Sequence, residues 1–130
     1  MPATQRAHTW RMQRFTELKV WQRSHAFVLD VYRVTAGFPA EERYALTSQL
    51  RRAVTSVPTN IAEGSRLQGN HEYARFLNIA QGSLAETEYL LLLARDLGHL
   101  PPPVFDRLAA EADEVARMLH GLWTKVEGST

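Results

Sequence analysis

The 130-residue chain contains no cysteine, which excludes disulfide bridges and thiolate chemistry. It also lacks an apolar run of about 18 residues, the length that a transmembrane helix needs, so no membrane partner is expected. The N-terminal segment MPATQRAHTWRMQR is polar and basic and lacks the apolar middle of a signal peptide. These absences predict a cytoplasmic protein, and the length suits a single domain.

Lysine is nearly absent, because arginine outnumbers it 13 to 2. Although the formal net charge is only +1, residues 1–66 hold ten Lys/Arg against five Asp/Glu, and residues 67–130 hold five against nine. Phosphate recognition favours the guanidinium group, which binds phosphate oxygens in pairs. A GC-rich genome also enriches arginine, so the excess alone leaves both explanations open.

Strand-like alternation of apolar and polar residues is absent, and nearly every segment has helical periodicity. The first helix is expected to begin with Thr16 as N-cap and to end at Gly37 and Pro39. Its expected apolar stripe places a histidine in the core and consists of Leu18, Trp21, His25, Val28 and Tyr32.

The second helix carries a proline inside its apolar repeat. Its expected stripe comprises Leu46, Leu50, Ala53, Val54, Val57 and Ile61. Pro58 costs about 3 kcal/mol or more in a helix interior, so a new helix starting at Ser56 is an alternative. At about 100° per residue, however, Leu50 and Ile61 lie within about 20° of each other. We therefore predict one helix, kinked at Pro58, with Gly64 as its left-handed C-cap.

Two further helices have unbroken stripes. The third is expected to begin with Asn70 as N-cap and to end at Gly98, and its stripe comprises Tyr73, Leu77, Ala80, Leu84, Thr87, Leu91 and Ala94. The fourth follows HLPPP, interpreted as a rigid linker, and its stripe comprises Phe105, Leu108, Ala112, Val115, Leu119, Leu122 and Val126. The predicted fold is all-α: an antiparallel up-and-down four-helix bundle over residues 16–127, preceded by a flexible basic tail over residues 1–15.

Polar residues form a second stripe on the second helix, namely Gln49, Arg52, Ser56, Asn60 and Glu63. Arg52 and Glu63 share a face but lie roughly 16 Å apart, so each needs a partner from another helix, another subunit or a ligand. The third helix carries Gly82 beside Ser83, although glycine costs about 1 kcal/mol relative to alanine in a helix interior. Asn60, Glu63, Gly82 and Ser83 are therefore predicted to form an interface or a polar network that sets helix register.

Two segments carry a family resemblance: QLRRA at 49–53 with NIAEG at 60–64, and FLNIA at 76–80 with GS at 82–83. They make the chain similar to the bacterial four-helix-bundle proteins encoded within intervening sequences of 23S ribosomal RNA genes. The resemblance implies a ring-like homopentamer and an unbroken second helix. A distant branch of that fold serves diversity-generating retroelements, where a pentameric accessory protein binds a reverse transcriptase and RNA. The segment LPPPVFDRL departs from the usual, more polar and acidic pattern.

A catalytic role is not expected. Metal sites in helix bundles use Glu-x-x-His pairs, which the chain lacks, and its five histidines are dispersed. No nucleophile motif, glycine-rich phosphate loop or zinc-ligand spacing occurs. We therefore predict a protein that is not an enzyme and has no catalytic residue, metal or cofactor.

The arginines instead suggest RNA binding, in which phosphates are held by cations and unpaired bases stack on aromatic or guanidinium planes. The predicted ligands are Arg51, Arg52, Arg66 and Arg75 around the junction of the second and third helices, and Arg11 and Arg14 in the tail. Repetition around a homo-oligomeric ring would strengthen their field. The alternative is a protein-interaction scaffold without nucleic-acid contact, since the third helix carries apolar residues beyond its stripe.

Overall fold

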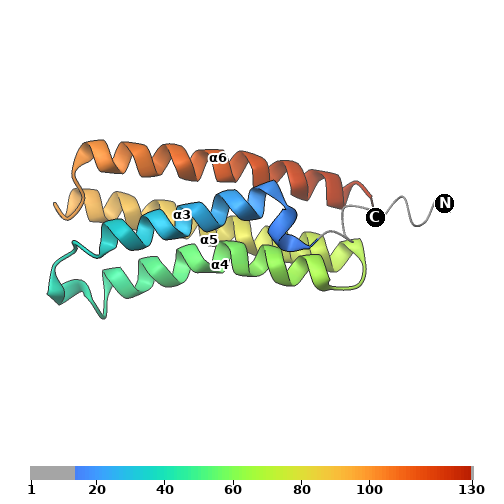
Figure 1. The fold of residues 1–130 in the computed structure, drawn as a ribbon, viewed down its shortest axis with the longest axis horizontal. Coiled ribbons are helices and arrows are strands. Elements are labelled where there is room, and N and C mark those ends of the chain that lie inside the picture. Colours follow the sequence, from blue (N-terminus) through green and yellow to red (C-terminus); the bar gives the residue numbers. More distant parts are fainter. Residues whose placement is uncertain (1–13, 130) are drawn as a thin grey trace.

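The structure is a computed structural model that describes residues 14–129. Four long helices follow one another in this part of the chain: α3 (Lys19–Thr35), α4 (Leu46–Arg66), α5 (Asn70–Asp96) and α6 (Pro102–Glu127). Two short 3-10 helices, η1 (Phe15–Glu17) and η2 (Ala40–Glu42), precede α3 and α4. Successive helices run in opposite directions (Figure 1) and each packs against two neighbours, so the predicted all-α four-helix bundle is confirmed.

The core follows the predicted stripes in three of the four helices. Every stripe residue of α4 and α5 is buried, and α6 buries Leu108, Ala112, Val115, Leu119 and Val126. These helices repeat apolar residues at three- and four-residue spacing, which keeps one face directed at the bundle axis. Between residues 14 and 129, no helix is both long and apolar enough to cross a membrane.

Helix α4 continues through Pro58 without a break, which confirms the prediction of a single helix there. Pro58 is buried, so apolar burial offsets part of the lost backbone hydrogen bond. Hydroxyl groups reinforce the backbone around it: Thr55 Oγ1 donates to the Arg51 carbonyl at 2.9 Å, and Thr59 Oγ1 donates to the Thr55 carbonyl at 2.7 Å.

Gly64 is not the C-cap of α4, so that prediction is wrong. The helix extends to Arg66 and is capped by Leu67 in an extended conformation. Gly64 is buried where α4 meets α5: a Cβ atom there would lie 2.8 Å from Cβ of Phe76 and 3.1 Å from Cδ1 of Tyr73. This position requires glycine because there is no room for a side chain, and not because the backbone needs glycine's conformational freedom.

Three predicted helix starts also shift by a few residues. Thr16 lies within η1, and α3 begins at Lys19 after an extended Leu18. In the α4–α5 turn, Gly69 takes a positive φ of 83°, and Asn70 is the first residue of α5 rather than its N-cap. Helix α6 starts at Pro102, inside the predicted linker, because a proline in the first turn loses no hydrogen bond that the helix could make.

The core face of helix α3 matches the predicted stripe only in part: Leu18 and Val28 are buried as expected, but the centre of the buried face lies to one side of the stripe. Its buried residues are Val20, Ser24, Phe27, Val28, Asp30, Val31 and Thr35. Ser24 can be buried because its hydroxyl donates to the Trp21 carbonyl at 2.9 Å. The prediction of a core His25 is wrong, since that side chain is exposed, and Tyr32 is 40% exposed. Of the aromatic residues that were expected inside, His25 and Tyr32 therefore lie at the surface, whereas Trp21 is half-buried against the core.

Candidate nucleic-acid interface

Four aromatic residues, here called the aromatic stripe, follow one another along η1 and α3: Phe15, Trp21, His25 and Tyr32. The first two are half-buried and the last two are exposed. The Phe15 and Trp21 rings meet edge to face with centroids 5.1 Å apart. The His25 ring stacks on Trp21 at 5.1 Å with only 11° between the ring planes. Tyr32 follows His25 by seven residues, about two helical turns, and so lies on the same side of α3.

Arginines from α4 cover both ends of the aromatic stripe. The Arg66 guanidinium lies 5.9 Å from the centroid of Phe15, and the Arg51 guanidinium lies 4.5 Å from the centroid of Tyr32. Arg51 also ties α4 to the end of α3, because Nε donates to Thr35 Oγ1 at 2.9 Å and Nη2 donates to the Tyr32 carbonyl at 3.2 Å. Guanidinium groups over aromatic faces gain cation–π energy and keep polar N–H groups available.

A hollow of about 250 Å³ adjoins the Arg51 end, and Arg43 lines it together with Arg51, Thr35 and Thr47. At the opposite end, Arg14 directly precedes Phe15 and is exposed. We call the aromatic stripe together with Arg14, Arg43, Arg51 and Arg66 the α3–α4 face. Arg51 and Arg66 are fifteen residues apart on α4, roughly 22 Å, so the face is long and narrow.

The arginines fall into two groups by partner. Among residues 14–129, an ion pair with a carboxylate is made by Arg23, Arg33, Arg75, Arg95, Arg107 and Arg117. In the same part of the chain, no carboxylate lies within ion-pair distance of Arg14, Arg43, Arg51, Arg52 or Arg66. All of this second group precede α5, and four of its five members belong to the α3–α4 face. Among the arginines of residues 14–129, those without an ion pair therefore all precede α5, and Arg43, Arg51 and Arg66 belong to the α3–α4 side of the bundle.

The predicted arginine ligands do not form one cluster. Arg51 and Arg52 lie towards the α3–α4 turn, whereas Arg66 and Arg75 lie at the α4–α5 turn. Arg52 donates to Ser48 Oγ at 3.1 Å. Arg75 is held by both carboxylate oxygens of Glu72 at 3.1 and 3.2 Å, and this contact lowers the pKa of Glu72. Arg11 lies outside the described residues.

The predicted polar stripe on α4 forms part of a network with α5. The hydroxyl groups of Ser56 and Ser83 are 2.8 Å apart, and Asn60 Nδ2 donates to Ser56 Oγ at 2.9 Å and to its carbonyl at 2.8 Å. Glu63 and Gly82 are exposed and lie outside these hydrogen bonds, and a Cβ atom at Gly82 would meet open space. The exposed apolar residues of α5 and its C-terminal end are Ile79, Tyr89, Leu92 and Leu97, and Ile79 lies about one turn from Ser83.

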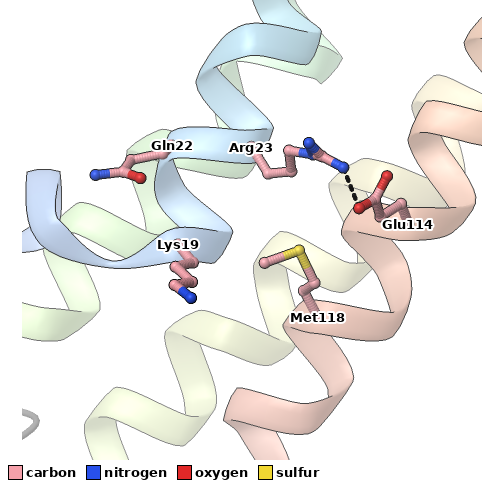
Figure 2. A pocket seen from close by; sticks show the side chains of 5 residues that line it. All are labelled: Lys19, Gln22, Arg23, Glu114 and Met118. Carbon is pink, nitrogen blue, oxygen red and sulfur yellow. Dashed lines mark hydrogen bonds and ion pairs between the residues drawn. The ribbon is translucent and has the colours of Figure 1, made fainter.

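A second hollow, of about 460 Å³, lies between α3 and α6 and is lined by Lys19, Gln22, Arg23, Glu114 and Met118 (Figure 2). Arg23 pairs with Glu114 across it. Further along the same seam, Arg107 Nη2 donates to the buried Asp30 at 3.0 Å, and Asp30 also faces Glu111. Burial, together with the adjacent Asp30, raises the pKa of Glu111 to about 7.

The charged groups between α3 and α6 explain how two carboxyl groups share one site. Oε2 of Glu111 is buried and meets no hydrogen-bond donor among residues 14–129. A proton on Glu111 provides the donor that joins it to Asp30, whose pKa is held below its ordinary value by hydrogen bonds from Glu111 and Arg107 despite burial. Nothing in this arrangement suits a metal ion: no group of three or more His, Asp or Glu side chains converges within the described residues.

Comparison with known proteins identifies the family. Residues 16–121 match the family described as 23S rRNA-intervening sequence protein. The chain belongs to this family. Comparison with curated proteins gives no match. Among solved structures, this family member is similar to a protein of unknown function from the S23 ribosomal protein family of Bacteroides thetaiotaomicron, with a TM-score of 0.75 and 23% identity over 81% of this chain and 95% of that one. At that identity the likeness supports the fold alone.

Sequence reasoning alone missed five members of the α3–α4 face in this family member. Phe15, Trp21, His25 and Tyr32 were assigned to the tail or the core, and Arg43 was not considered. A usable signal existed on α3, which has two apolar arcs. One arc has purely apolar side chains (Val20, Phe27, Val31). The other consists of aromatic residues that also carry polar atoms, and such residues commonly lie at surfaces and interfaces.

Proposed function

We propose that this protein binds RNA through the α3–α4 face. The observation that carries the proposal is that the guanidinium groups of Arg14, Arg43, Arg51 and Arg66 make no ion pair within residues 14–129 and that these residues border one aromatic stripe. Phosphate contacts supply most of the sequence-independent affinity for nucleic acid, and exposed aromatic rings add stacking sites for bases. The match to a family named for ribosomal RNA genes agrees with such a partner.

Self-association would increase the effect of this face. Ile79, Tyr89 and Leu97, on α5 and at its C-terminal end, are between 41% and 59% exposed, and Ile79 lies about one turn from Ser83, which joins α5 to Ser56 of α4. We infer that a second copy of the chain covers this surface, and the resemblance implies a closed pentamer. Each additional subunit then presents another α3–α4 face, so that weak contacts act together. Light scattering tests this directly against the monomer mass of 14.8 kDa.

The RNA-binding proposal is tested by fluorescence anisotropy with a structured ribosomal-type RNA across a salt series. The slope of log affinity against log salt is about −0.7 to −0.9 per phosphate neutralised. Arg43→Ala combined with Arg66→Ala removes two cations that make no hydrogen bond or ion pair within residues 14–129, and we expect the slope to become shallower by about 1 to 2.

Arg117→Ala is the matched control, because Arg117 lies exposed on α6 and pairs with Asp113 at 3.5 Å. It should leave the salt slope unchanged. If Arg117→Ala made the salt slope shallower by as much as the double variant does, overall charge, and not this face, would account for binding. Absence of binding at low salt, with an oligomer present in light scattering, would instead support the protein-interaction scaffold.

A further inference from the structure

We propose that the aromatic stripe is a stacking platform for unpaired RNA bases, with the flanking arginines on the adjoining phosphates. This inference rests on the RNA binding proposed above and names the class of RNA that the face takes. The observation behind it is the stacked pair of nearly parallel rings of Trp21 and His25, with the imidazole exposed to solvent. A base lying on His25 continues a stack that the protein has already begun.

The geometry favours unpaired over duplex RNA. Bases in a duplex are stacked on each other and hide their faces, whereas bases in loops, bulges and single strands can lie against aromatic side chains. The α3–α4 face also has the shape of a strip. Arg51 and Arg66 are roughly 22 Å apart along α4, and a strand that rises about 3.4 Å per nucleotide covers that distance with about six nucleotides.

The two ends of the strip offer a different contact from its middle. Arg66 over Phe15 and Arg51 over Tyr32 each combine a guanidinium group with a ring, and guanidinium planes can also stack with bases. In the middle, the Trp21–His25 pair has no arginine in a ring contact within the described residues. We therefore assign phosphate binding mainly to the ends and base stacking mainly to the middle.

A purely structural role for the rings must be separated from ligand binding. Phe15 and Trp21 pack partly against the core, so their removal could disturb the fold. His25 is exposed and lies outside the core, which makes it the better position to change. His120 on α6 is a matched control, because it is also exposed and also stacks on a tryptophan, Trp123, with centroids 5.7 Å apart and 25° between planes.

The test measures anisotropy of a fluorescent ten-nucleotide single-stranded RNA and of a blunt duplex of the same sequence. We expect the full-length protein to bind the single strand more tightly. His25→Ala should weaken single-strand binding roughly 5- to 150-fold, the range for one lost base stack, and leave duplex binding unchanged. His25→Phe, which keeps a flat ring, should restore it, and His120→Ala should behave as the unmodified protein.

Each other outcome overturns the inference in a recognisable way. If the protein binds strand and duplex with equal affinity and His25→Ala has no effect, RNA binding stands but is due to phosphate contacts alone, without base stacking. Equal losses in His25→Ala and His120→Ala would show that the effect does not belong to this platform. If neither RNA binds at low salt, the proposed function fails together with this inference.

Discussion

Two seams of the bundle are built in opposite ways. Helices α4 and α5 approach so closely that Gly64 has no room for a side chain against Phe76 and Tyr73. Their polar contacts are short and uncharged, as between Ser56 and Ser83. Helices α3 and α6 are joined by long charged side chains, with Arg23 reaching Glu114 and Arg107 reaching Asp30, and hollows remain between them (Figure 2).

The difference shows that one bundle can fix its helix pairs by unlike physical means. The α4–α5 seam depends on the volume of small residues, so changes in size should affect it and changes in pH should not. The α3–α6 seam contains Glu111, whose pKa is raised to about 7, so pH should affect it. The following predictions test this contrast, from the largest expected effect to the smallest.

Gly64→Ala should give the largest change. The new Cβ atom would lie 2.8 Å from Cβ of Phe76, and the neighbouring atom is close to the α5 backbone and cannot rotate away. Overpacking of this kind typically costs about 1–3 kcal/mol. We expect the free energy of unfolding, measured by urea denaturation, to fall by that amount at pH 5 and at pH 8 alike. An unchanged denaturation midpoint would contradict the close approach of α4 and α5.

Glu111→Gln should change the pH dependence of stability. Because the pKa of Glu111 rises from 4.5 to about 7 on folding, the folded protein holds a proton between these values that the unfolded chain releases. Its contribution to stability is therefore present below about pH 4.5 and is lost as pH rises to about 7. Glutamine stays neutral at every pH, so the stability of the variant should not fall as pH rises. At pH 8 the variant should therefore melt at a higher temperature than the unmodified protein.

Glu114→Gln is the control for that experiment, since Glu114 lies one turn further along α6 and pairs with Arg23. Thermal melting of the three proteins at intervals from pH 5 to pH 8 makes the comparison. The control should keep the decline in stability between these pH values. If the stability of the Glu111→Gln variant declines with pH as steeply as that of the unmodified protein, the proposed proton on Glu111 beside Asp30 is wrong.

Gly82→Ala should give the smallest change, and in the opposite direction from Gly64→Ala. A Cβ atom at Gly82 meets open space, and alanine is favoured over glycine in a helix interior by up to about 1 kcal/mol. We expect a modest rise in the free energy of unfolding. If a second subunit covers this surface, as proposed, light scattering should at the same time show weaker association. Destabilisation of the monomer would contradict the exposed position of Gly82.

Sequence patterns predicted the helices well wherever one apolar arc dominates. In α4, α5 and α6, apolar residues recur without a competing arc, and the phase of Leu50 and Ile61 was enough to carry α4 through Pro58. In α3, two arcs have similar apolar content, and the pattern favoured the one of which only Leu18 and Val28 are buried. Which arc is buried depends on how α3 leans between α4 and α6, and that is a property of the assembled bundle.

The candidate site was predictable only in part. The excess of arginine in residues 1–66 indicated a basic region, and Arg14, Arg51 and Arg66 were among the residues chosen. That these arginines lie at the two ends of a strip, with an aromatic stripe between them, could not be deduced from chain order. Arg75 also could not be distinguished from the others, although its pairing with Glu72 compensates its charge.

The sequence by itself determined the helical class, the unbroken α4 and the core of three helices, because these follow from local periodicity and helix phase. Only the tertiary structure decided that Gly64 serves close packing, that His25 lies at the surface, and that particular arginines lack carboxylate partners within residues 14–129. Each of these depends on distances between residues that are far apart in the chain. Such distances are set by how the four helices pack together.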